Sequence, residues 1–89
     1  MQAKTKRPTL SALVRRYRNA RGLTLRDVAD GLVDYGVPKT RGAVHHWERG
    51  GGIRMDATAA LVDFFGLEGA ARLEFYDAAG FVIPKEWVK

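Results

Sequence analysis

Apolar residues recur every three or four positions near the start of the chain, which is the spacing of one face of an α-helix. The first apolar stripe consists of Leu10, Leu13, Val14 and Tyr17. Thr9 or Ser11 can cap this helix at its N-terminus, and Gly22 can end it. Arg18 lies four residues after Val14, at the edge of the stripe, so its side chain is a candidate to reach inward.

The same spacing predicts a second helix whose apolar stripe is Leu25, Val28, Ala29 and Leu32. Thr24, followed three residues later by Asp27, resembles a capping box in which Asp replaces the usual Glu. We therefore expect the second helix to begin after Thr24. Gly36 and Pro38 are expected to close it.

The stretch TRGAVHHWERG, residues 40–50, predicts a short third helix with two different faces. Thr40 can cap its N-terminus, and Gly50 can end it in the left-handed conformation. Val44, Trp47 and Glu48 fall on one side of this helix. The polar and basic residues project from the other side; they are Arg41, Gly42, His45, His46 and Arg49.

Two more helices and a short extended segment complete the pattern. Asp56 can cap a fourth helix, whose apolar contacts are Ala59, Val62, Phe64 and Phe65 and which Gly66 ends. Residues 68–79 predict a fifth helix with Phe75 on its apolar face. Residues 81–84 are too few and too close to Pro84 for another helix, so they are expected to be extended, before a charged tail with Trp87. The fold class is therefore all-α, a compact bundle of five helices.

Composition favours one small domain with a polyanionic partner. The chain has 89 residues and a net charge of +5, and a chain of this length can bury a single core without a metal or disulfides. All eight Lys and Arg residues up to Arg26 precede the first acidic residue, whereas the remainder is slightly acidic. This polarised charge fits either a nucleic-acid surface or a solvated arm and helix face.

Several function classes find no support in the residues. The chain has no cysteine, its two histidines are adjacent, and it lacks G-x-S-x-G, HExxH and Walker motifs. We therefore expect no metal, no cofactor, no small-molecule substrate and no enzymatic activity. The basic start is followed by no apolar signal region, and no apolar run could span a bilayer. A cytoplasmic, nucleoid-associated protein without a membrane partner is the expectation.

The residues between Leu10 and Leu67 resemble the Cro/phage-repressor and XRE family of helix-turn-helix regulators. The resemblance rests on RNARGLTLRDVADGL, then on TR-x-AV-x-x-WE-x-G in the third helix, and then on a capped apolar helix ending FFGL. It implies a lambda-repressor-like bundle in which the second and third helices form the helix-turn-helix. It also implies a buried ion pair between Arg18 and Glu48, in agreement with their inward positions.

The resemblance further implies which residues contact DNA. The N-terminal part of the third helix would contact base edges in the major groove, through Arg41, Gly42 and His46 with His45 beside them. Phosphate contacts would come from helix starts, loops and the basic arm. The candidates for phosphate contact are Thr24, Arg26, Thr40, Arg49, Arg54, Lys4, Lys6 and Arg7.

The chain departs from the family pattern at four places. Gly42 stands where a polar side chain often contacts bases, and Leu25 stands where a polar residue often contacts phosphate. Gly51 and Gly52 replace the usual polar or basic residues after the third helix. The connection between the second and third helices is about five residues longer than in the shortest members, with VDYGVPK filling the gap. A tight turn is therefore not assured there.

These interpretations divide the chain into a flexible basic arm (1–8), a helix-turn-helix domain (9–67) and a C-terminal helix with its tail (68–89). The predicted function is sequence-specific binding of double-stranded DNA by a transcriptional regulator, a repressor acting as a dimer on a pseudo-palindromic operator. The candidate dimer surface is Phe75, Phe81, Val82, Ile83 and Trp87. The alternative, of equal weight, is that these residues complete the monomer core. The alternative functions are a protein-binding adaptor or antitoxin that grips its partner with the C-terminal segment, and non-specific nucleic-acid binding by the arm.

Overall fold

The computed structural model describes residues 8–84 and residue 86, and this part of the chain folds into five α-helices and one short 3₁₀ helix without a strand. The helices are α1 (Leu10–Ala20), α2 (Leu25–Leu32), α3 (Arg41–Glu48), α4 (Met55–Phe65) and α5 (Gly69–Ala78). The 3₁₀ helix η1 (Val33–Tyr35) follows α2 directly. The all-α, five-helix fold class expected from the sequence is confirmed.

Threonine hydroxyls begin the first three helices. Thr9, Thr24 and Thr40 each accept a hydrogen bond from the backbone N–H three residues later, at 3.0–3.2 Å. The carboxylate of Asp27 also accepts from the N–H of Thr24, which completes the capping box. Each bond satisfies a donor that the first turn of a helix leaves unpaired.

The fourth helix begins differently from the prediction. Arg54 occupies the N-cap position and no side chain caps it, while Asp56 lies inside the first turn. There the Asp56 carboxylate accepts from the N–H of Ala57 at 2.7 Å, and the hydroxyl of Thr58 donates to the carbonyl of Arg54. Asp56 as N-cap was therefore wrong by two positions, although a carboxylate in the first turn still suits the helix dipole.

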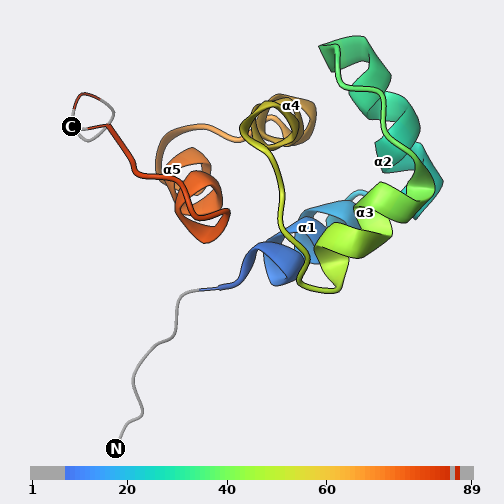
Figure 1. The fold of residues 1–89 in the computed structure, drawn as a ribbon, viewed down its shortest axis with the longest axis horizontal. Helices are drawn as coiled ribbons and strands as arrows, with labels where there is room; N and C mark the ends of the chain where they lie inside the picture. The colour runs from blue at the N-terminus through green and yellow to red at the C-terminus, as the bar shows by residue number, and fades with distance from the viewer. Residues whose placement is uncertain (1–7, 85, 87–89) are drawn as a thin grey trace, which may run out of the picture.

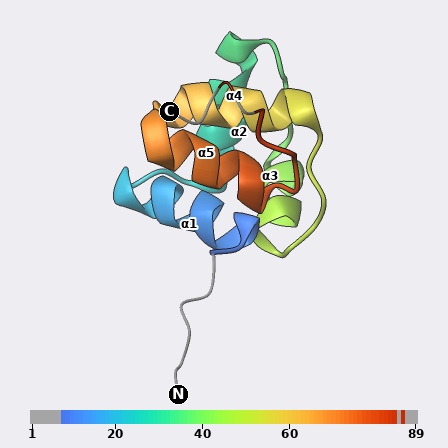
Figure 2. The same cartoon turned by 90° about the vertical axis from the view of Figure 1, so that its left-hand side faces the viewer.

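The helices form two groups that share one core. In Figures 1 and 2, α1, α5 and α4 are stacked side by side, and α2 and α3 cross behind them in the second view. Helix α3 packs against both α1 and α2, and α4 contacts both α2 and α5. The core residues with no exposed surface come from all five helices; they are Leu13, Val14, Val28, Leu32, Val44, Leu61 and Phe75. Because α3 joins α1 and α2 through this core, its orientation is fixed by tertiary packing.

The connection between α2 and α3 is a structured segment and not a tight turn. After Leu32 the chain continues as η1, and Gly36 then adopts a left-handed φ of 78°. Val37 enters the core, with 9% of its surface exposed. The ring of Tyr35 packs edge-on against Phe64 of α4, with centroids 6.3 Å apart. The α-helix thus ends four residues before Gly36, and the extra residues provide a second attachment to α4.

The C-terminal candidate surface separates into core and exposed residues. Phe75 has no exposed surface, so it belongs to the monomer core and cannot be part of a dimer surface. Phe81 and Ile83 are half-buried against the core, whereas Val82 is 92% exposed. Residues 81–84 have no regular secondary structure. Trp87 lies outside the described residues.

Candidate nucleic-acid interface

Helix α3 has one buried and one exposed face. Val44, Trp47 and Glu48 are 0%, 4% and 6% exposed. The exposed residues are Arg41, Gly42, His45, His46 and Arg49. Because no acidic side chain lies on the exposed face, α3 presents only neutral or basic groups to solvent. The spacing of the sequence therefore gave both faces of α3 correctly.

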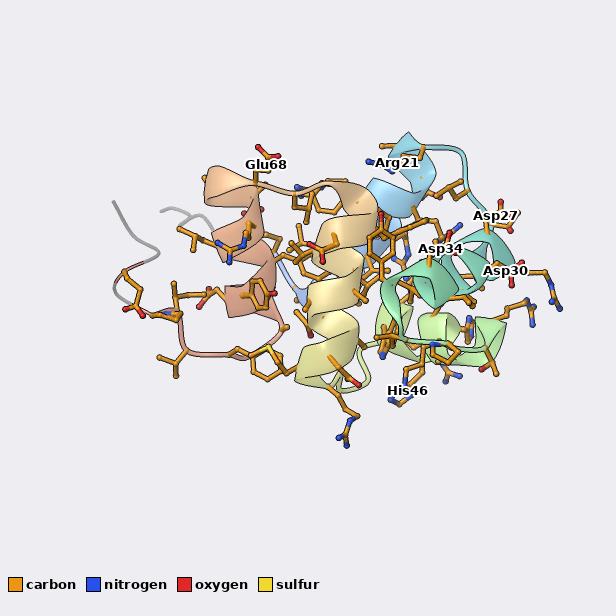
Figure 3. The ribbon with its side chains drawn as sticks, turned by 90° about the horizontal axis from the view of Figure 1, so that it is seen from above. Arg21, Asp27, Asp30, Asp34, His46 and Glu68 are labelled. Carbon is orange, nitrogen blue, oxygen red and sulfur yellow. The ribbon has the colours of Figure 1, made fainter. Side chains whose placement is uncertain are left out.

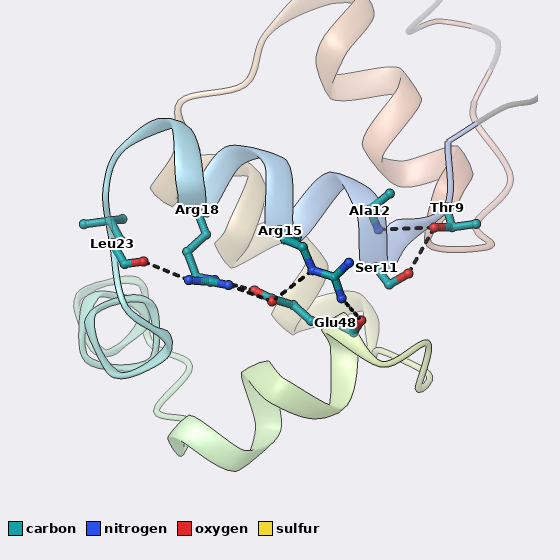
Figure 4. Close-up of polar contacts among 7 residues, drawn as sticks. All are labelled: Thr9, Ser11, Ala12, Arg15, Arg18, Leu23 and Glu48. Atoms are coloured by element: carbon teal, nitrogen blue, oxygen red, sulfur yellow. Dashed lines mark hydrogen bonds and ion pairs between the residues drawn. The ribbon is translucent and has the colours of Figure 1, made fainter.

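The buried carboxylate of Glu48 is bound by Arg18 of α1 in a two-point contact (Figure 4). Nε and Nη2 of Arg18 donate to the two carboxylate oxygens at 2.5 and 2.9 Å, and Nη1 donates to the carbonyl of Leu23 at 3.0 Å. The side chain of Arg18 is 17% exposed. The hydrogen bonds to Glu48 raise the pKa of Arg18 above its ordinary value, against the opposing effect of burial. The guanidinium is therefore charged at any physiological pH.

Arg15 makes a second contact from α1 to the end of α3. Its Nη2 donates to the backbone carbonyl of Glu48 at 2.9 Å, and its Nε lies 3.6 Å from the Glu48 carboxylate. This carbonyl belongs to the last turn, where carbonyl groups lack helical partners and the helix dipole favours a cation. Arg15 was not among the predicted inward-reaching residues, although its spacing of three residues from Arg18 places both side chains on one side of α1.

Arg21 continues this arginine row toward α4. Its Nη1 and Nη2 donate to the carbonyls of Phe64 and Phe65 at 3.2 and 2.7 Å, and its guanidinium carbon lies 5.9 Å from the Phe65 ring centroid. Arg15 and Arg18 of α1 thus bind the C-terminal end of α3, and Arg21, the residue that follows α1, binds the C-terminal end of α4. Part of the basic charge near the N-terminus therefore has a structural role.

A hollow opens on the exposed face of α3. It is lined by Gly42, His45, His46, Arg49, Gly50 and Gly51. In Figure 3, His46 projects from α3, whereas Asp27, Asp30 and Asp34 lie apart from it along α2 and η1. The acidic side chains are therefore separated from the basic face, which leaves the hollow suited to a group that accepts hydrogen bonds.

The candidate phosphate-contacting residues within the described part of the chain lie at the starts of α2, α3 and α4 and at the end of α3. Thr24 and Thr40 use an oxygen lone pair to cap α2 and α3, so each hydroxyl hydrogen remains able to donate to a phosphate. Arg26 and Arg49 are exposed. Arg54 is also exposed and its Nε lies 3.9 Å from Asp56, a distance that leaves most of its donors to solvent. Leu25 is half-buried. Lys4, Lys6 and Arg7 lie outside the described residues.

Comparison with known proteins identifies a family. A sequence model described as a helix-turn-helix domain matches residues 9–75, which include α1 to α4 and most of α5. No curated protein and no solved structure gives a significant match. Within the described residues, no helix is long and apolar enough to cross a bilayer.

Proposed function

The chain belongs to the helix-turn-helix domain family, whose domains bind DNA, and on this premise we propose that it is a sequence-specific transcriptional regulator of the Cro/phage-repressor and XRE type. The supporting observation is the way in which α3 is held against the rest of the domain. Its buried face is held by Arg15 and Arg18, and its opposite face is wholly free of acidic groups. A helix so fixed can enter the major groove in one orientation.

Base contacts are proposed for the exposed residues of α3. Arg41 lies in the first turn, the part of the recognition helix that contacts base edges in this fold. Its guanidinium can donate to both O6 and N7 of a guanine. His45 and His46 lie in the following turn, where each neutral imidazole offers one donor. Gly42 contributes backbone and space in place of a side chain.

Phosphate contacts are proposed on both sides of α3. The starts of α2 and α4 carry Thr24, Arg26 and Arg54, and the start and end of α3 carry Thr40 and Arg49. Such contacts fix the register of a protein on the duplex but carry no sequence information directly. The basic residues Lys4, Lys6 and Arg7 would add to them without bearing on specificity.

We further propose that the regulator is a repressor that binds as a dimer. Two recognition helices about 34 Å apart would then occupy successive major grooves of a pseudo-palindromic operator. The segment 81–83 supports this proposal, because Val82 exposes 92% of an apolar side chain beside the half-buried Phe81 and Ile83. The same exposure favours the alternative of an adaptor or antitoxin that binds another protein through this segment.

Selection from a random duplex pool tests the proposal. We expect one sequence to be enriched, and to bind at least about 10³-fold more tightly than random DNA at physiological salt. For both duplexes log affinity should fall with log salt by about 0.9 per phosphate neutralised. A protein that enriches no sequence but keeps the salt dependence would be a non-specific binder. Absence of binding to either duplex would favour the protein-binding alternative.

A further inference from the structure

Three consecutive glycines follow α3, and they are glycines for different reasons. Gly50 has a left-handed φ of 95°, which ends the helix. Gly51 and Gly52 have no positive φ, so their backbone would accept any L-residue. A Cβ on Gly52 would meet nothing within 4 Å. A Cβ on Gly51, in contrast, would lie 2.1 Å from Nε2 of His46.

The ring of His46 therefore occupies the space that a side chain on residue 51 would fill. The hypothetical Cβ would also be 2.3 Å from Cε1 and 2.4 Å from Cδ2 of the same ring. The backbone holds the two residues together, because the N–H of Gly51 donates to the carbonyl of His46 at 2.9 Å. His46 thus directs its imidazole toward the loop that follows α3.

This direction departs from the usual direction of helical side chains. Long side chains in a helix generally point back toward the N-terminus, over the residue four positions earlier. For His46 that residue is Gly42, where a Cβ would meet only the hydroxyl of Thr40 at 3.6 Å. The imidazole therefore has two places to lie, on Gly51 or over Gly42, and in this structure it lies on Gly51.

The place over Gly42 is one part of the hollow on the exposed face of α3, which extends from Gly42 to Gly51. The hollow is lined by His45, His46 and Arg49 as well as by Gly42. Arginine offers only donors and a neutral histidine offers one. In the major groove, O6 and N7 of guanine form the base edge that consists of acceptors alone. An open hollow at Gly42 would admit such an edge, whereas an imidazole lying over Gly42 would fill it.

We propose that Gly51 is a positioning residue for base recognition: it holds the ring of His46 against the loop and so keeps the hollow above Gly42 open for the acceptor edge of a guanine. This inference rests on the proposed DNA-binding function. It assigns a specificity role to a residue that need not touch DNA. Because the clash involves the far end of a rotatable side chain, Gly51→Ala should turn the ring and leave the fold intact.

The position of the His46 ring can be tested without DNA by NMR on the free protein. Cross-relaxation between the ring protons of His46 and the α-protons of Gly51 is expected in the wild type and in Gly52→Ala. In Gly51→Ala the ring protons should instead be close to Gly42. Absence of the contact with Gly51 in the wild type would overturn the inference whatever the protein does with DNA.

The test with DNA uses the duplex that the wild type selects and its single-base variants. Gly51→Ala should lose about 5-fold or more of the discrimination for guanine at one position, a loss within the range of a good base contact. Gly52→Ala, the matched control, should lose none. The double variant Gly51→Ala/His46→Ala has no ring that can fill the hollow. Its discrimination for guanine should therefore lie within about twofold of that of the single variant His46→Ala. The double variant also remains informative if Gly51→Ala alone folds poorly.

The outcomes separate the inference from the function on which it rests. A wild type that enriches no sequence refutes the proposed function, and the specificity role with it. A wild type that selects a sequence, with equal discrimination by Gly51→Ala and Gly52→Ala, overturns the inference alone. Failure of the double variant to recover would show that residue 51 acts by a route other than the His46 ring, which also overturns it.

Discussion

At the scale of single residues, Glu48 joins α1 to α3. Its carboxylate accepts two hydrogen bonds from Arg18, and its carbonyl accepts one from Arg15. Glu48 is only 6% exposed, so its charge would be costly to bury without these partners. This buried contact therefore fixes the orientation of α3 more strongly than a surface ion pair would.

We expect Glu48→Gln to lower the free energy of unfolding by about 2–4 kcal/mol. The substitution leaves the largely buried Arg18 without a counter-charge, and breaking a buried pair from one side typically costs about 3–5 kcal/mol. The lower range allows for the 17% exposure of the Arg18 side chain. In a domain of this size the melting temperature should fall by roughly 10–30 °C.

Arg18→Met should have a similar effect, because it leaves the carboxylate unpaired in the same place. Glu74→Gln is the matched control, since it removes one negative charge from an exposed position on α5 and should change stability by no more than about 0.5 kcal/mol. Melting temperatures of Glu48→Gln and Arg18→Met equal to that of the control would show that the pair contributes nothing to stability.

Residue spacing predicts some of these contacts and not others. Arg18 and Glu48 were found because each lies on the inward side of its own helix, a property that local spacing determines. Arg15 and Arg21 bind backbone carbonyls at the ends of other helices. Those acceptors are set by the tertiary positions of α3 and α4, so no local pattern indicates them. The contact of His46 with Gly51 depends on a rotamer and was likewise not predictable.

At the scale of elements, the sequence predicted helices well where their limits are local. Capping threonines and left-handed glycines act through bonds within a few residues, and they placed α1 and α3 correctly. The end of α2 was misplaced because the chain continues directly into the 3₁₀ helix η1, which contacts α4. Its Tyr35 ring packs on Phe64, and the Phe64 ring in turn covers Gly31 of α2. This packing requires α4, which is distant in sequence.

Two helical glycines provide a test of that packing. A Cβ on Gly31 would lie 2.2 Å from the Phe64 ring, whereas a Cβ on Gly42 has no contact shorter than 3.6 Å. Alanine normally stabilises a helix relative to glycine by up to about 1 kcal/mol. We expect Gly42→Ala to raise the melting temperature and Gly31→Ala to lower it, because Phe64 must leave its place between α2 and Tyr35. Thermal unfolding followed by circular dichroism measures both, and an equal rise in both variants would contradict the packing.

At the scale of the whole molecule, the exposed face of α3 lies apart from the aspartates of α2 and η1 (Figure 3). The exposed face of α3 carries no acidic side chain, whereas three aspartates lie on α2 and η1. The net charge of +5 alone could not predict this separation, since Arg15, Arg18 and Arg21 bind groups at the ends of α3 and α4 of the same chain. The direction in which the protein would approach an anionic partner therefore follows from the fold and not from the composition.

Self-association through segment 81–83 can be tested by a substitution at Val82. If segment 81–83 forms the dimer surface, Val82→Asp should weaken dimerisation at least about tenfold by placing a charge in an apolar interface. The melting temperature of the monomer should not change, because Val82 is 92% exposed. Sedimentation equilibrium measures the dimer constant. Val33→Asp, at a 55% exposed position on η1, is the control; equal dimer constants in both variants would place the interface elsewhere.

The proposed function requires α3 to contact bases, and one ratio measures this contact: the affinity for the selected duplex divided by the affinity for random duplex. We expect Arg41→Ala to lower this ratio by about 5- to 150-fold, corresponding to a base contact of about 1–3 kcal/mol. Arg16→Ala removes the same charge from an exposed position on α1 and should leave the ratio unchanged. An unchanged ratio in Arg41→Ala, with both duplexes weakened equally, would contradict base recognition by this residue and the proposed role of α3.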